Sequence, residues 1–229
     1  TIQADDTTSL YKPRDNREMV MDSVLQDINY ACDHIMNRAE TTVTPSMALA
    51  MKSRICLFEG TYRKYHAVNP STGEAWKDAT ASQRFLQECV AASEKIMNSG
   101  MFKLYNTGKP ETDYRYVFQQ EKPVKDEVIW AKEYSAELSS YHNLTQLFVS
   151  SGNQSNRWSP TQEFVNTYLN RDGSRFTDAA GYETKNFVQN STNRDCRLAQ
   201  SMMMPGYTKL NNNGEKMETT PDWSVTMTV

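Results

Sequence analysis

The sequence contains no hydrophobic run of 18 or more residues, so no segment of it is predicted to cross a membrane. Its first residues, Thr1 to Asp6, contain neither the basic stretch nor the apolar stretch of a signal peptide. They also lack an initiating methionine. We therefore expect the chain to be an internal piece of a longer protein, with any export signal or lipid-anchor cysteine upstream of it.

A strong charge of one sign is also absent. The 229 residues carry a formal net charge of -3, and the lysines and arginines are scattered along the chain. This distribution excludes the basic surface of a nucleic-acid-binding protein. Hydrophobic residues at 38% are enough for a core, and charged residues at 23% predict a polar surface. The profile is typical of a globular domain and not of a disordered chain.

Patterns that bind metals or catalyse reactions are missing as well. The four cysteines form no CxxC pair, and their spacings match no zinc site. Three of them lie on apolar faces of predicted helices, where we expect core packing. A disulfide remains the alternative, since an oxidising compartment would permit one. The three histidines show no HxxxH or HExxH spacing, and no GxSxG motif or phosphate-binding loop occurs. We expect no enzyme, no cofactor and no metal site.

The Asp172-Gly173 pair is not the centre of a calcium-binding loop. With Gly173 at the sixth position of an EF-hand loop, Tyr168 would stand first and Ala179 twelfth. Both terminal ligands would then be missing. The pair instead predicts a turn that follows a helix.

Three long helices are predicted in the first hundred residues. The first covers about Asp15–Arg38, with an apolar residue at every third or fourth position. The second covers about Pro45–His66, with Thr44 as its N-cap and an apolar band wide enough for contacts on two sides. The third covers about Lys77–Ser99, with Gly100 as the left-handed residue after it. The predicted fold class is mainly α, with stacked tetratricopeptide-like helical pairs, long irregular loops and minor β structure.

The pattern changes after the third helix. Residues 126–134 alternate like a strand, and we expect Trp130 to face the core. A short helix is predicted at Pro160–Leu169, with Ser159 as its cap, and polar residues elsewhere predict long loops. We expect two domains: a helical-repeat core at residues 1–110 and a loop-rich region at residues 111–229. We also expect truncation at both chain ends.

Five sequence blocks in one order carry a resemblance to a known family. Residues 48–62 (ALAMKSRICLFEGTY) are similar to its "ALkaRvaLyaG" helix, and residues 96–104 (IMNSGMFKL) to its "vi.sG.y.L" junction. Residues 116–118 and 127–130 are similar to "y..lF … EiIf". Residues 159–173 are similar to "PT.elvd.Y…DG", and residues 193–206 to "RDpRl … pG". The chain thus resembles an internal segment of a SusD/RagB-type protein.

The resemblance implies a non-enzymatic, helix-rich lipoprotein of polysaccharide utilisation and nutrient uptake. Such a protein is lipid-anchored at the outer membrane of Gram-negative bacteria and binds an oligosaccharide or polysaccharide at the cell surface. It acts as a lid over a SusC-like TonB-dependent transporter, which imports the glycan. The sequence departs from the family in its short length and at Cys196, which stands where the "RDpR" block has proline.

Tryptophans are the first candidates for glycan contact. A flat aromatic face matches the C–H patch of a sugar, while amide and guanidinium groups reach the hydroxyls. Trp158 closes a loop that mixes aromatic and amide residues; packing beneath the following helix is the alternative for it. Trp76 ends the loop between the second and third helices and could also pack against the helix start. The candidate ligand-binding residues are Tyr141, His142, Asn153, Gln154, Arg157, Trp158 and Trp76.

Other interpretations stay open at the level of sequence. A helical-repeat scaffold would bind peptides or proteins, a SusD-like protein could capture peptides, and a glycan-active enzyme would need two convergent carboxylates. For the Arg194-Asp195-Cys196-Arg197 block, we expect a structural role, in which it holds its loop onto the helical body.

Overall fold

The computed structural model describes residues 5–36, 42–120, 122–132, 134, 137, 139–140, 159–202, 204, 208–210 and 216–218. These residues are mainly helical, as predicted, and none of their helices is long and apolar enough to span a bilayer. The chain divides into two units. Thr1–Leu104 with Lys125–Lys132 form the helical unit, and Tyr105–Val124 with Glu133–Val229 form the loop unit. The boundary predicted at residue 110 stays a prediction.

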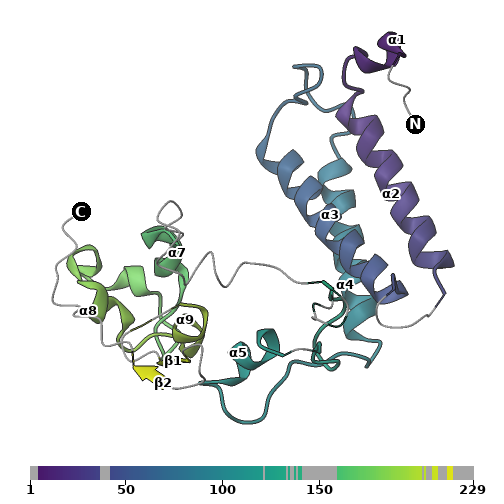
Figure 1. The fold of residues 1–229 in the computed structure, drawn as a ribbon. Coiled ribbons are helices and arrows are strands. Elements are labelled where there is room, and N and C mark those ends of the chain that lie inside the picture. Colours follow the sequence, from purple (N-terminus) through teal and green to yellow (C-terminus); the bar gives the residue numbers. More distant parts are fainter. Residues whose placement is uncertain are drawn as a thin grey trace. The chain divides into compact units, whose positions relative to one another are not determined.

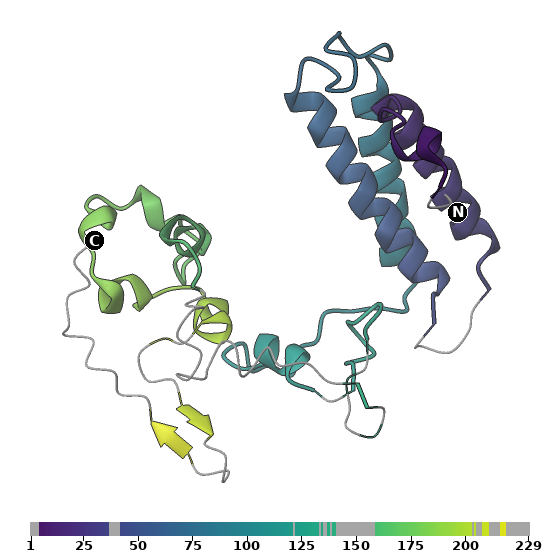
Figure 2. The ribbon, with the colours of Figure 1, turned by 45° about the horizontal axis from the view of Figure 1, so that its top comes forward.

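The helical unit contains a one-turn helix and three long helices. Helix α1 covers Thr7–Leu10, α2 covers Arg17–His34, α3 covers Pro45–Tyr65 and α4 covers Ala81–Met97. The three long helices lie side by side, and α3 packs against both α2 and α4 (Figures 1 and 2). The three helices predicted from the sequence are confirmed, and each observed helix is somewhat shorter than predicted.

Local signals in the sequence place the helix ends. The Thr44 hydroxyl accepts a hydrogen bond from the Met47 amide at 3.2 Å, and Pro45 occupies the first helical position. Both predictions for the start of α3 are confirmed. The cap stabilises the helix because it gives a partner to an amide that has none within the helix. After α4, Gly100 has a φ of 68°, the left-handed conformation that the sequence predicts there.

The core of the helical unit lies between the three long helices. Leu25 of α2, Cys56 of α3, and Ala81 and Phe85 of α4 are buried together. Cys89 packs against this cluster, so two of the three cysteines expected in the core lie there. Burial raises the pKa of the Cys56 thiol to about 11, so the thiol stays protonated at neutral pH.

The apolar band predicted for α3 is not the face that the helix buries. Leu57 and Phe58 are 51% and 61% exposed, while Lys52, Glu59 and Arg63 are buried. The prediction that α3 has neighbours on two sides is confirmed, since it packs against α2 and α4, but Leu57 and Phe58 of the predicted band do not take part in the buried contacts. The buried charges are compatible with a core position because each of them has a partner of opposite charge: Lys52 pairs with Glu88, and Glu59 pairs with Arg63 and with Arg17 of α2.

Helices α3 and α4 approach each other closely at Gly60. A Cβ atom at this position would lie 2.7 Å from Cγ of Leu86. The Ser82 hydroxyl of α4 donates a 2.7 Å hydrogen bond to the Gly60 carbonyl. The contact therefore requires a residue without a side chain on α3.

Gly60→Ala is expected to destabilise the protein by about 1–3 kcal/mol, because the added methyl group overpacks the contact with Leu86. Helix propensity alone predicts the opposite effect, since alanine is favoured over glycine by about 1 kcal/mol. Urea denaturation followed by circular dichroism measures the difference. Ser23→Ala on the exposed face of α2 is the control. Greater stability of Gly60→Ala than of the unsubstituted chain would show that the two helices can separate at no cost.

The loop unit consists of short elements. Helix α5 (Asp113–Phe118) packs against α9 (Cys196–Ser201), and the Arg115 amide donates to the side chain of Gln200 at 2.9 Å. The remaining elements are α7 (Gln162–Thr167), the 3-10 helices η1 (Phe176–Asp178) and η2 (Tyr182–Thr184), α8 (Phe187–Ser191), and the antiparallel strands β1 (Thr208–Leu210) and β2 (Lys216–Glu218).

Two predictions for the second half are corrected. The described residues of 126–134 form no strand, and Trp130 is 51% exposed instead of facing the core. An alternating pattern forms a strand only if a neighbouring strand pairs with it, and the described strands of the chain pair with each other at 208–218. The helix predicted at Pro160–Leu169 is shorter, and its N-cap is Thr161 instead of Ser159, because the Thr161 hydroxyl accepts from the Phe164 amide.

Candidate functional site

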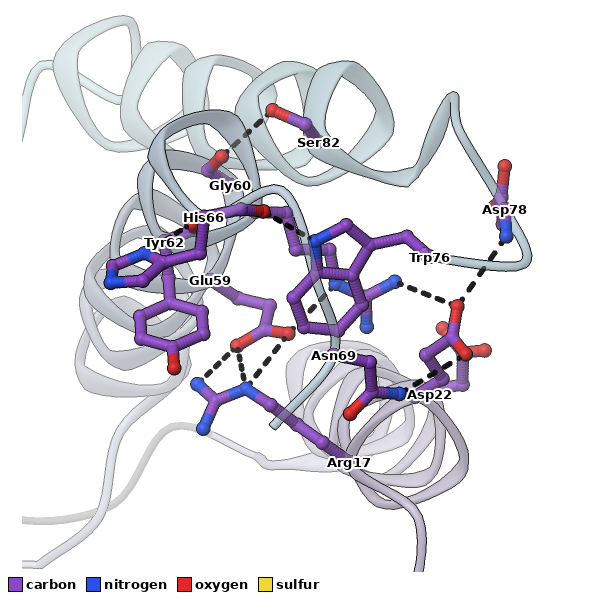
Figure 3. A network of polar contacts seen from close by, with 12 residues as sticks. Arg17, Asp22, Glu59, Gly60, Tyr62, His66, Asn69, Trp76, Asp78 and Ser82 are labelled. Carbon is purple, nitrogen blue, oxygen red and sulfur yellow. Dashed lines mark hydrogen bonds and ion pairs between the residues drawn. The ribbon is translucent and has the colours of Figure 1, made fainter. Parts of the chain in front are cut away.

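Trp76 closes the loop between α3 and α4 in the helical unit (Figure 3). Its indole Nε1 donates a 2.6 Å hydrogen bond to the His66 carbonyl at the end of α3. The ring lies edge-on to Tyr62, and the Arg63 guanidinium carbon lies 5.0 Å from the ring centre. Trp76 is half-buried in these contacts, which hold the base of the loop. A role of Trp76 in glycan contact stays a prediction.

Asn69 ties the same loop to the start of α2. Its side chain is fully buried, and the amide Nδ2 donates to Asn16 at 2.9 Å and to Glu18 at 3.3 Å. Glu18 also accepts a 3.0 Å hydrogen bond from the Lys77 amide. The loop therefore has fixed partners on α2 as well as on α3.

A buried ion-pair network, the Glu59 network, joins α2 and α3 beneath this loop (Figure 3). Glu59 is fully buried and accepts from Arg17 Nη2 at 2.6 Å and from Arg63 Nε at 2.8 Å. The Arg17 guanidinium also lies over the Tyr62 ring, 4.2 Å from its centre. Since Glu59 pairs with an arginine of each helix, the network holds α2 and α3 together.

Six of the seven predicted ligand-binding residues cannot be placed. Tyr141, His142, Asn153, Gln154, Arg157 and Trp158 all lie outside the described residues. Among the predicted candidates, only Trp76 has a described position.

The loop unit contains a hollow that the sequence did not indicate. Its volume is about 520 Å³, within the range of about 300–1,000 Å³ that is usual for small-molecule sites. Most of the residues that line it have polar or charged side chains, and one has an aromatic ring. The lining residues are Glu163, Asn166, Thr167, Leu169, Arg175, Thr177 and Tyr182.

A tight turn brings two sides of this hollow together. The Asn170 amide donates to the Ser174 carbonyl at 2.9 Å, and Gly173 has a φ of 86°. The Asp172 carboxylate accepts from the hydroxyl and the amide of Ser174, and these hydrogen bonds lower the pKa of Asp172. The turn predicted at Asp172-Gly173 is confirmed, and it places Leu169 and Arg175 on the same hollow.

Arg194 holds the segments behind the hollow. The side chain is buried, and Nη2 donates to the carbonyls of Val165 and Tyr168 at the end of α7, at 2.7 and 2.8 Å. Nη1 donates to the Asn190 carbonyl of α8 at 2.9 Å. The guanidinium carbon lies 3.8 Å from the centre of the Phe176 ring, which is itself buried. Arg194 therefore connects segments within the loop unit, and the expectation that its block holds this loop onto the helical body stays a prediction.

Several groups that line the hollow are available to a ligand. Among the residues that the structure describes, no hydrogen bond or ion pair engages the side chains of Glu163, Arg175 and Thr177 or the Tyr182 hydroxyl. The described part of the chain also holds no group of three or more histidine, cysteine, aspartate and glutamate residues suited to a metal ion. The hollow can therefore donate and accept hydrogen bonds, and it offers a ring edge or face.

Sequence reasoning missed these residues although it singled out the segment around them. The block at 159–173 was used for its likeness to a family pattern, and no spacing rule connects Asn166, Arg175 and Tyr182. They converge through a turn and two single-turn helices, which have no periodic signal.

Comparison with known proteins agrees with the resemblance seen in the sequence. Residues 126–228 match the model of the SusD family. The searches among curated proteins and among solved structures gave no match. Two of the five blocks, at 159–173 and 193–206, lie wholly within the matched range, as do residues 127–130 of a third block and the hollow. Through residues 126–228, the chain is similar to the SusD family.

Proposed function

We propose that the chain captures an oligosaccharide or polysaccharide at the cell surface and delivers it to a SusC-like TonB-dependent transporter. The match of residues 126–228 to the SusD family carries this proposal. Proteins of this family bind nutrient glycans in polysaccharide utilisation, are generally non-catalytic, and are associated with the outer-membrane surface. Anchoring of this protein through a lipid at that membrane is part of the proposal.

Stacking and hydrogen bonding account for the capture, and no bond is broken. Half-burying one aromatic side chain against a sugar stabilises the complex by about 2–3 kcal/mol before association costs. After these costs, one or two such contacts support binding in a range of about micromolar to millimolar Kd. Such affinity suits a protein that must release its polymer to a transporter.

The loop at 141–158 is the proposed main contact with the glycan. Trp158 would provide the stacking face, while Arg157, Asn153 and Gln154 would reach the sugar hydroxyls. Tyr141, His142 and Trp76 complete the proposed set. The proposal for these residues depends on the composition of the sequence.

The helical unit is the proposed contact surface for the transporter. Leu57, Phe58 and Tyr65 of α3 are 51%, 61% and 75% exposed, although all three are large and apolar or aromatic. Such residues are enriched in the buried centres of protein interfaces. Their exposure supports a protein partner for this helix.

Affinity electrophoresis of the whole chain in gels that contain different polysaccharides tests the glycan-binding function. We expect retardation by one polysaccharide class and its loss in Trp158→Ala. Trp130→Ala is the matched control, since Trp130 is half-exposed and lies outside the proposed loop. Circular dichroism verifies that each variant is folded. Unchanged retardation of Trp158→Ala would move the site away from this loop, and the absence of retardation by any glycan would contradict the proposed function.

A further inference from the structure

We propose that the hollow of the loop unit is a second glycan subsite that binds a neutral sugar residue through its hydroxyl groups. This inference rests on the proposed glycan-binding function and adds to it a site away from the 141–158 loop. Its key residues are Glu163, Asn166, Arg175 and Tyr182, all of which line the hollow.

The chemistry of the lining suits a ligand that is rich in hydroxyl groups. A sugar hydroxyl both donates and accepts, so its recognition needs acceptors and donors close together. The Glu163 carboxylate can only accept, the Arg175 guanidinium can only donate, and the Asn166 amide can do both. The half-buried Tyr182 ring adds an apolar surface for the C–H groups of a sugar.

The charges of the hollow favour a neutral sugar over an acidic one. Arg175 would attract a carboxylate or sulfate group on the ligand, but Glu163 lines the same hollow and would repel it. The two residues form no ion pair with each other. A ligand that bridges them through two hydroxyls satisfies both charged groups, each through a charge-assisted hydrogen bond.

The walls of the hollow are fixed before a ligand binds. Arg194 links the end of α7 to α8 by hydrogen bonds and stacks on Phe176 of η1. Phe176 in turn lies edge-on to Tyr182, with 6.0 Å between the ring centres. Because α7, η1 and η2 are connected in this way, little backbone freedom is lost on binding.

Isothermal titration calorimetry of the whole chain tests the subsite. The probes are maltohexaose, xylohexaose and mannohexaose as neutral oligosaccharides, hexagalacturonate as an acidic one, and glycylglycine as a zwitterion. For a neutral probe that binds, we expect Arg175→Ala and Tyr182→Ala each to raise Kd about tenfold or more, because each removes one principal contact. Glu163→Gln should raise Kd less, because glutamine retains an acceptor.

Matched controls separate the subsite from general effects of charge. Arg54→Ala on α3 and Glu183→Gln on η2 remove exposed charged groups that do not line the hollow, so they should leave Kd unchanged. Amide chemical shifts of residues 163–182, recorded during the same titration, should move in the unsubstituted chain. This second measurement does not depend on whether a variant folds.

Other results would contradict the subsite, its preference for neutral sugars, or glycan binding itself. Neutral binding that is lost in Trp158→Ala but unchanged in Arg175→Ala and Tyr182→Ala would reject the subsite and leave the proposed function intact. Binding of hexagalacturonate alone, strengthened by Glu163→Gln, would reject the neutral class. Binding of glycylglycine alone would indicate peptide capture and reject both proposals. Both proposals would also be rejected if no probe bound and no polysaccharide gel retarded the chain.

Discussion

Glu59→Ala is expected to destabilise the helical unit by about 3–5 kcal/mol, because it removes one partner from a buried ion-pair network. The Glu59 side chain is fully buried, and it accepts hydrogen bonds from Arg17 and Arg63. Without it, the Arg63 side chain, which is only 2% exposed, keeps a single and longer ion pair, with Glu18 at 3.9 Å. An unpaired charge in this position is much less favourable than a solvated one.

Urea denaturation and hydrogen exchange resolved along the chain measure this effect. The loss of protection should appear in α2, α3 and the 66–76 loop, which contact the Glu59 network. Glu94→Ala on the exposed surface of α4 is the control, and it should change stability by no more than about 0.5 kcal/mol. If the two variants were equally stable, the network would contribute nothing to the fold.

Arg194→Ala is expected to destabilise the loop unit by about 3–4 kcal/mol, because three backbone carbonyls lose a charged donor. The substitution also uncovers Phe176, on which the guanidinium stacks. Arg194→Lys should restore only part of the stability, since an ammonium group lacks the planar fork that reaches α7 and α8 together.

Arg197→Ala is the matched control, since Arg197 belongs to the same sequence block. Its side chain is 57% exposed and pairs with Asp195, so its loss should change stability by about 1 kcal/mol or less. Hydrogen exchange of residues 162–191 distinguishes the two variants. Unchanged protection of this segment in Arg194→Ala would contradict the role assigned to Arg194. Because Arg194→Ala disturbs the hollow, it should also weaken the binding of any ligand there.

The fold of the helical unit could be predicted to a large extent, because its signals are local. The Thr44 cap, the left-handed Gly100 and the periodic apolar residues each report on a few neighbouring positions. The buried face of α3 could not be predicted in the same way. Glu59 is compatible with the core because two arginines pair with it, and one of these contacts, with Arg17 of α2, joins residues far apart in the sequence.

The candidate site shows the same division between local and distant signals. The turn at Asp172-Gly173 was predictable from two residues, and it forms part of the hollow. The convergence of Asn166, Arg175 and Tyr182 depends on Arg194, a residue outside the segment that it organises. Trp130 gives the opposite lesson: an alternating pattern around it predicted a strand, and no pairing partner is present among the described residues.

The Glu59 network also determines how far α2 and α3 can slide along each other. Apolar faces pack almost equally well after a shift of one helical turn, about 5.4 Å, because the same kind of side chain recurs there. A carboxylate and a guanidinium at a single level of the bundle oppose such a shift, since the buried Glu59 would lose the one partner that α2 provides. Arg17 and Glu59 thus select one alignment of the two helices from several that the apolar contacts alone would allow.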